Sequence, residues 1–261
     1  MTGRPRTPPL VRRLLAEFLG TALLVMVVIG SGIAAQQLSP DDIGLQLLEN
    51  STATVFGLGV LILMLGPVSG AHFNPVVSAA DWLLGRRAGT GMAGSTVGLY
   101  ALAQIAGAVA GAVLANVMFD LAAFQLSTKA RITSGHLLGE VVATGGLVLL
   151  IFALARTGRA ALSAAAVGAY IGAAYWFTSS TSFANPAVTI GRVFSDTFAG
   201  IAPASMPPFV AAQLVGGLVG LALVVVLYPD ATATADNAVV PHGGAGSVES
   251  GRPIDGTDGP S

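Results

Sequence analysis

The sequence contains no cysteine and little charge. Only 10% of its 261 residues are charged, the net charge is −1, and Lys129 is the single lysine. Without cysteine, the chain can form neither a disulfide framework nor a cysteine metal site. Without a basic face, it offers no surface to nucleic acid. We therefore expect no metal, no cofactor and no nucleic-acid partner.

Apolar residues are abundant instead. They make up 53% of the chain, and the mean hydropathy is +0.76. An apolar run of about twenty residues can cross the roughly 30 Å hydrocarbon core of a lipid bilayer. Six such runs are present, at 14–35, 44–65, 94–119, 137–155, 160–177 and 209–228. The sequence therefore predicts an all-α membrane protein with six transmembrane helices.

Two shorter apolar segments, 73–84 and 184–194, contain the dipeptides Asn74-Pro75 and Asn185-Pro186. They are too short to span a bilayer and have the length of re-entrant helices. Asparagine is a favourable N-cap, and proline fits the first helical position because it has no amide hydrogen to leave unpaired. We therefore predict two re-entrant half-helices that begin at the asparagines.

The chain also contains an internal repeat. Glu17 near the start of the first span corresponds to Glu140 in the fourth, Gln104 corresponds to Gln213, and the two Asn-Pro pairs correspond to each other. Each copy holds three spans and one half-helix, so the second copy must be inverted relative to the first. Inverted repeats with broken helices indicate a solute path at the bilayer midplane.

These features divide the chain into three parts. We expect an arm at 1–13, a channel domain at 14–228 and a disordered tail at 229–261, which is rich in glycine, serine and proline. The first repeat occupies about 14–119 and the second about 134–228. Nine arginines fall on the side of the termini, and one lysine and two arginines fall on the other. This bias predicts a multi-pass protein of the cell membrane with both termini cytoplasmic.

The paired half-helices suggest a mechanism. If they meet N-terminus to N-terminus, each presents roughly half a positive charge at the midplane. That field opposes cations and protons, but it does not oppose a neutral solute.

Two segments around the asparagines match one another: Ser69-Gly70-Ala71-His72-Phe73-Asn74-Pro75-Val76 and Phe183-Ala184-Asn185-Pro186-Ala187-Val188. They resemble the signature boxes of the major intrinsic proteins, the aquaporins and aquaglyceroporins, and the resemblance extends from Glu17 to about Tyr228. It implies a right-handed six-helix bundle, one pore per subunit and a homotetramer. It also implies that the amides of Asn74 and Asn185 bond the passing solute. Val76 replaces the usual alanine and should point away from the lumen.

The family also has an outer selectivity filter, with an arginine three positions after the second asparagine. In this chain that position is Val188. Ungapped spacing places the other filter residues at Thr54, Ala173 and Ser182, and Phe56 replaces Thr54 if the loop before Gly70 is two residues shorter. None of these residues is charged. The resemblance therefore predicts a wide filter that passes water, glycerol-like polyols or metalloid hydroxides such as arsenous acid, the neutral form of arsenite. Bacterial relatives associated with arsenic resistance also lack this arginine, and residues 176–183 are similar to that subgroup.

Several roles remain open at this point. Arg192 could be a displaced positive charge at the outer vestibule, or it could bond loop carbonyls or Asp196. His72 could gate the pore by protonation or make a structural hydrogen bond. Glu17 and Glu140 could relay protons or hold the loops before the half-helices.

The alternative function is a coupled secondary transporter, a class that also uses inverted repeats. Such a transporter needs a cation site, for which the spans offer almost nothing beyond the two glutamates. No Ser/His/Asp or His-Glu-x-x-His constellation is present, so we do not expect an enzyme.

Overall fold

The computed structural model describes residues 8–89 and 91–229, and these residues form helices and loops without a strand. Six helices are long and apolar enough to cross a membrane, which confirms the predicted spans. The elements are α1 (Leu10–Leu38), α2 (Ile43–Ser69), α3 (Pro75–Ala88), α4 (Gly94–Met118), α5 (Ser134–Arg156), η1 (Ala160–Leu162), α6 (Ser163–Phe177), α7 (Pro186–Gly191), η2 (Arg192–Phe194), η3 (Pro203–Ser205) and α8 (Met206–Leu227). Most of the proposed arm and almost all of the proposed tail lie outside the described residues.

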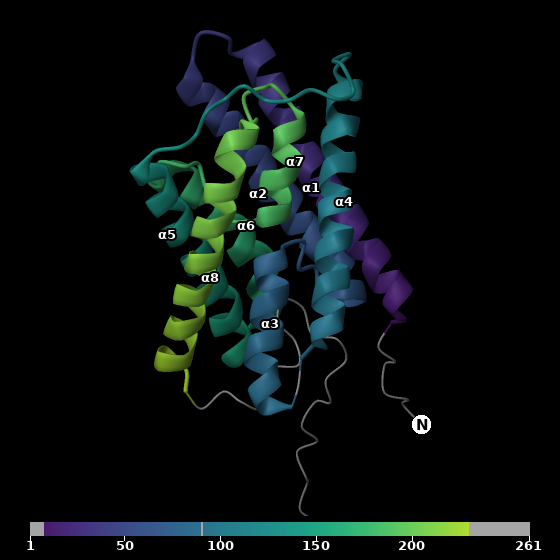
Figure 1. Ribbon diagram of the computed structural model, residues 1–261, viewed down its shortest axis with the longest axis vertical. Coiled ribbons are helices and arrows are strands. Elements are labelled where there is room, and N and C mark those ends of the chain that lie inside the picture. The colour runs from purple at the N-terminus through teal and green to yellow at the C-terminus, as the bar shows by residue number, and fades with distance from the viewer. Residues whose placement is uncertain (1–7, 90, 230–261) are drawn as a thin grey trace, which may run out of the picture.

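The two short helices lie inside a ring of long ones. In Figure 1, α3 runs from the middle of the bundle to its lower end, and α7 runs from the middle to its upper end. The first residues of α3 and α7 therefore meet near the centre. The start of α1 and the end of α8 both lie at the lower end of the bundle.

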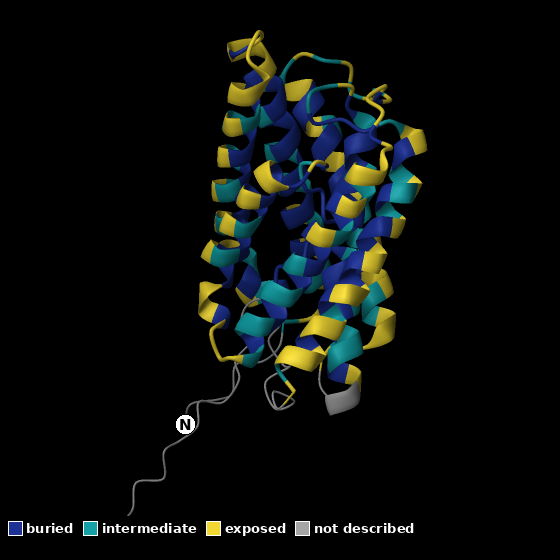
Figure 2. Ribbon diagram, turned by 90° about the vertical axis from the view of Figure 1, so that its left-hand side faces the viewer, coloured by how far each residue is buried: buried dark blue, intermediate teal, exposed yellow. Residues whose placement is uncertain are grey.

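The outer surface of the bundle is apolar. Figure 2 shows buried residues on the inward faces of the helices and exposed residues on the outward faces. Many of the exposed residues are large and apolar, and Phe56 of α2, for example, is 70% exposed. Exposed apolar faces on all the long helices are what a protein surrounded by lipid requires.

Corresponding helices pack closely in the two halves of the chain. α1 packs against α4, and α5 packs against α8. A Cβ atom on Gly111 would lie 2.1 Å from the carbonyl oxygen of Ala22, and a Cβ atom on Gly220 would lie 2.5 Å from that of Gly145. The backbones therefore touch at these glycines. Close contact of this kind drives helix association where lipid removes the hydrophobic force between helices.

Candidate functional site

The two asparagines cap the half-helices, as their sequence context predicts. The Oδ1 atom of Asn74 accepts a hydrogen bond of 3.0 Å from the amide of Val76. The Oδ1 atom of Asn185 accepts hydrogen bonds from the amides of Ala187 and Val188 at 3.0 and 3.3 Å. Pro75 and Pro186 occupy the first helical positions. Each asparagine oxygen is thereby committed to its own helix.

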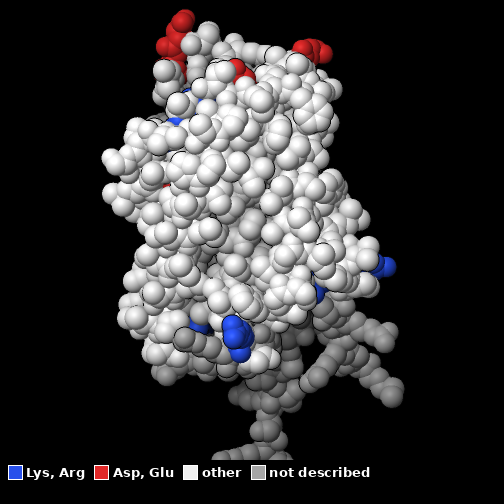
Figure 3. Space-filling model, in the orientation of Figure 1, with Lys and Arg blue, Asp and Glu red and all other residues white. Residues whose placement is uncertain are grey.

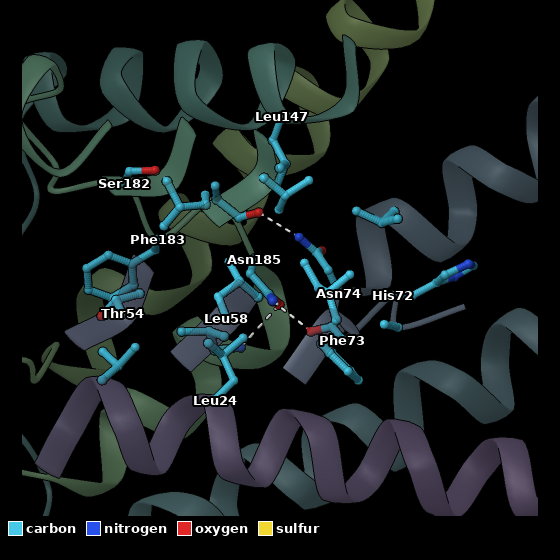
Figure 4. A pocket seen from close by; sticks show the side chains of 18 of the residues that line it. Leu24, Thr54, Leu58, His72, Phe73, Asn74, Leu147, Ser182, Phe183 and Asn185 are labelled. Atoms are coloured by element: carbon cyan, nitrogen blue, oxygen red, sulfur yellow. Dashed lines mark hydrogen bonds between the residues drawn. The ribbon is translucent and has the colours of Figure 1, made fainter. Parts of the chain in front are cut away.

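The asparagine nitrogens bond across the two repeats. Asn74 donates from Nδ2 to the carbonyl oxygen of Ala184 at 2.8 Å, and Asn185 donates to that of Phe73 at 2.7 Å. Figure 4 shows the two side chains side by side with these bonds dashed. Each amide group carries a second hydrogen. Both asparagines also line the central cavity, so the second donors lie at its wall.

Two buried glutamates hold the loops that precede the asparagines. Glu17 accepts hydrogen bonds from the amides of His72 and Phe73 at 3.0 and 2.7 Å. Glu140 accepts hydrogen bonds from the amides of Phe183 and Ala184 at 2.9 and 2.8 Å. The two sets of bonds occupy matching positions in the repeats, which confirms that these glutamates hold the loops.

The same loops adopt an unusual backbone conformation. Ala71 and Phe73 have φ values of 49°, and the corresponding Ser182 and Ala184 have φ values of 49° and 48°. Residues with side chains seldom adopt this left-handed region and do so only when their surroundings hold them there. The carboxylate bonds supply that restraint, and the carbonyls of Phe73 and Ala184 are thereby fixed where the asparagines reach them.

A cavity passes the asparagines at the centre of the bundle. Its volume is about 60 Å³, and residues of both repeats line it. In Figure 4, Thr54 and Ser182 lie on one side of the asparagines and His72 lies on the other. The side with Thr54 leads toward the end of the bundle where α7 ends, and we call it the upper branch.

The upper branch is lined by Thr54 of α2, which is 2% exposed and borders the cavity. Phe56 lies outside the cavity on the exposed face of the same helix. Of the two residues considered for this place, the structure therefore brings Thr54 to the cavity. Ser182 lines the branch too, and its buried Oγ has no hydrogen-bond partner among the described residues.

The expected position of Ala173 is wrong. This residue lies on the exposed face of α6, and Tyr175 borders the cavity instead. The hydroxyl of Tyr175 lies 3.2 Å from Oγ1 of Thr54. Counting back from Asn185 without a gap assumed a connection two residues longer than the one present. Two residues turn an α-helix by about 200°, which exchanges the lumen face for the lipid face.

The valines of the two signature boxes take different places. Val188 borders the upper branch. Val76 is buried away from the cavity, where a Cβ atom on Gly217 of α8 would lie 2.5 Å from its Cγ1. Val76 thus fills the space that the glycine leaves on α8. Ala187 is fully buried in the helix packing.

Arg192 lines the same cavity, so the cavity wall carries a positive charge in addition to the uncharged residues expected at the filter. Its guanidinium carbon lies 3.4 Å from the ring centroid of Phe183, and its Nε donates to the carbonyl oxygen of Ala199. Of the two partners considered for Arg192, the loop carbonyl is present, and Asp196 instead accepts hydrogen bonds from Thr128. The Nη atoms of Arg192 donate to none of the described residues, which leaves them for the lumen.

Arg192 is one of three cations that hold the loop above the upper branch. Lys129 donates to the carbonyl oxygen of Phe198 at 2.9 Å, and Arg131 donates from Nε to that of Gly200 at 2.8 Å. Burial, together with the charges of Arg131 and Arg192, lowers the pKa of Lys129 to about 8. Neither Lys129 nor Arg131 borders the cavity. Arg192 is therefore the member of this group whose charge acts on the lumen at close range.

His72 borders the cavity on the other side of the asparagines. Its Nδ1 lies 3.0 Å from Oγ of Ser78, and its ring contacts Tyr100 edge to face at 5.6 Å. The structural hydrogen bond considered for this residue is therefore present. A pH-dependent role for His72 stays a prediction.

Comparison with known proteins is consistent with this geometry. The model of the major intrinsic protein family matches residues 5–182. The chain belongs to the major intrinsic protein family. The matched range ends just before the second half-helix. The positions of Asn185, Val188 and Arg192 in this major intrinsic protein therefore come from its structure and not from the family match.

Among its relatives, an aquaglyceroporin of Rhizobium meliloti (strain 1021), AqpS, is 50% identical over 214 residues, which cover 82% of this chain and 89% of the relative. A glycerol uptake facilitator protein of Streptococcus pneumoniae (strain ATCC BAA-255 / R6) is 30% identical over 70% of this chain and 82% of its own length. The crystal structure of the aquaglyceroporin from Plasmodium falciparum superposes with a TM-score of 0.60 over 85% of this chain and 99% of that one. The sequence identity there is 21%, so this last likeness concerns the fold.

Proposed function

We propose that this chain is a passive membrane channel for small uncharged solutes, with water and glycerol-like polyols as its main cargo. The observation that carries the proposal is a central cavity lined by both asparagines, whose upper branch is bordered by polar and apolar side chains. The names of the relatives, aquaglyceroporin and glycerol uptake facilitator, support the same solute class.

The asparagines would serve as a bonding station at the midplane. A solute oxygen accepts the second hydrogen of Asn74 or Asn185 and so replaces the water that it leaves behind. The N-termini of α3 and α7 flank this point with partial positive charge. A neutral solute passes, whereas a proton or metal cation meets repulsion.

The upper constriction would select polyhydroxylated solutes. The hydroxyls of Thr54, Tyr175 and Ser182 form a polar side, and the unpartnered Oγ of Ser182 can both donate and accept. Val188 and Phe183 offer an apolar side to carbon-bound hydrogens. Glycerol presents both kinds of surface at once. Arsenous acid, a neutral molecule with three hydroxyls, meets the same hydroxyl groups, and the absence of cysteine leaves no thiolate to trap it.

Arg192 would provide the positive charge of the outer vestibule. Its Nη atoms can donate to a passing hydroxyl, while the charge discourages cations that approach from that side. Because the guanidinium is stacked on Phe183, it does not project freely across the lumen.

The proposed placement in the cell membrane follows the distribution of charge. On the face in Figure 3, acidic side chains lie at the upper end, and most of the visible basic side chains gather toward the lower end. With the positive end inside, the described ends of α1 and α8 are cytoplasmic, and the upper branch opens outward. We further propose that four such chains form a homotetramer with one pore each, as the family resemblance implies.

The test is solute uptake by proteoliposomes in stopped flow. We expect glycerol permeation in the unmodified protein and a larger loss of glycerol than of water flux in Val188→Arg, because a second guanidinium narrows the constriction. Phe56→Ala, on the lipid-facing side of α2, serves as the control and leaves both fluxes unchanged. Passage of water with rejection of every polyol and metalloid would contradict the proposed solute class. Dependence of uptake on proton or sodium gradients, removed by ionophores, would instead indicate the coupled transporter.

A further inference from the structure

A second hollow lies at the lower end of the bundle, separate from the pore. It is an open groove with about 1690 Å³ of empty space, bordered by the last turns of α3, α5 and α8. Its apolar wall includes Leu84 of α3 together with Leu221 and Val225 of α8. Its charged lining residues are Arg86 and Arg156, and no acidic residue lines it among those described. We call this hollow the arginine groove.

The packing of Arg156 fixes it at the edge of the arginine groove. Its Nη1 donates to the carbonyl oxygens of Val224 and Tyr228 at 3.2 and 2.6 Å, and it therefore satisfies carbonyls at the end of α8. Its Nε and Nη2 donate to no described residue. The guanidinium thus has donors left for a ligand, and its backbone bonds hold it in one orientation.

Arg86 approaches the same groove from α3. It is exposed, and its guanidinium carbon lies 5.7 Å from the ring centroid of Trp82. Neither groove arginine forms an ion pair within the described part of the chain. Asp81 lies on α3 more than one helical turn before Arg86. It is buried, accepts a hydrogen bond from the amide of Met92 and does not line the groove. The positive charge of the groove is therefore not neutralised by its lining.

The combination of an apolar wall and two guanidinium groups matches one kind of occupant. The lower end of the six spans is where the headgroups of a surrounding bilayer lie, and the part of α8 nearer the centre of the bundle faces acyl chains. Guanidinium groups bind phosphate through paired N–H donors. Basic pockets between transmembrane helices are known to bind anionic headgroups.

We propose that the arginine groove binds an anionic phospholipid such as phosphatidylglycerol. The phosphate lies between Arg86 and Arg156, and one acyl chain follows Leu221 and Val225 along α8. This site is distinct from the solute path, so it does not depend on which solute the channel passes.

The experiment is native mass spectrometry of the full chain in detergent, titrated with phosphatidylglycerol or with phosphatidylcholine of the same acyl chains. We expect tighter binding of phosphatidylglycerol, and about 5-fold weaker binding in Arg86→Gln, since one surface arginine contributes about that factor toward an anionic lipid. Arg159→Gln is the matched control, because Arg159 is exposed at the same end of the bundle but does not line the groove. We expect it to leave the affinity unchanged.

Four results would overturn the proposal. Equal binding of the two lipids, or equal losses in the Arg86 and Arg159 variants, would mean that general surface charge and not the groove attracts the lipid. Displacement of phosphatidylglycerol by millimolar glycerol phosphate would assign the groove to a soluble phosphate. A preference that appears only after removal of residues 231–261 would show that the end of this chain occupies the groove. Arg86→Lys keeps the charge, and partial recovery of affinity in that variant would support the proposal.

Discussion

Removal of the lumen charge of Arg192 should weaken cation exclusion while neutral solutes continue to pass. We take the separation between a cation in the upper branch and the charge of Arg192 as roughly 6 Å, about the pitch of one helical turn. At an effective dielectric constant of about 20, the repulsion at that distance is about 3 kcal/mol. Because about 1.4 kcal/mol corresponds to a factor of ten, Arg192→Ala should raise cation permeation about 100-fold.

The assay uses proteoliposomes with a trapped cation-sensitive dye for leak and stopped-flow light scattering for glycerol. Glycerol flux should not fall, since the smaller side chain widens the constriction. Arg192→Lys should keep most of the exclusion because it keeps the charge.

Arg131→Ala provides the matched control for this prediction. Arg131 donates to the carbonyls of Phe198 and Gly200, and its guanidinium carbon lies 5.2 Å from the ring centroid of Phe183, yet it does not border the cavity. Its loss should disturb the loop about as much as the loss of Arg192, without opening the pore to cations. The reasoning is refuted if Arg192→Ala remains folded and leaks no more than Arg131→Ala.

We expect three further outcomes from contacts in other parts of the bundle. Asn185→Asp should increase proton leak, measured with an internal pH dye under an imposed potential, because one carboxylate offsets the roughly one unit of positive charge from the two helix N-termini; an unchanged leak would count against the dipole barrier. Gly111→Ala should lower the free energy of unfolding in detergent by about 1–3 kcal/mol, measured by thermal unfolding, because the new Cβ would lie 2.1 Å from the backbone oxygen of Ala22. Gly98→Ala on the same helix is the control, since its Cβ would have no atom within 4 Å and should not be destabilising. Glu140→Ala strips three buried donors of their acceptor, at about 1–3 kcal/mol each, and should abolish the yield of monodisperse protein, while the lipid-facing Leu138→Ala should express normally.

Some of the structure could be predicted from local sequence because the responsible forces are local. A run of apolar residues spans a bilayer whatever its neighbours are, and Asn-Pro starts a helix through its own side chain and ring. The correspondence between Glu17 and Glu140 was visible because a repeat places equivalent residues at equivalent positions of its helices. These signals indicated the spans, the half-helices and the glutamates that hold the loops.

The lining of the upper branch could not be predicted in this way. A soluble helix reveals its inner face by amphipathic periodicity, but α6 is apolar on all sides and carries no such pattern. Its rotation is set by the length of the connection to Asn185 and by contacts with α2, among them the approach of the Tyr175 hydroxyl to Thr54. An error of two residues in that connection was enough to place Ala173 in the lumen.

Arg192 shows the same division most clearly. By sequence position it belongs one turn beyond Val188, and counting residues leaves the constriction uncharged. A long side chain, however, goes where its partners lie, and those partners are the ring of Phe183 and the carbonyl of Ala199. The sequence by itself determined that a positive charge lies near this mouth. The tertiary structure decided that the charge lines the pore, because only the folded loops bring the ring and the carbonyl together beside the lumen.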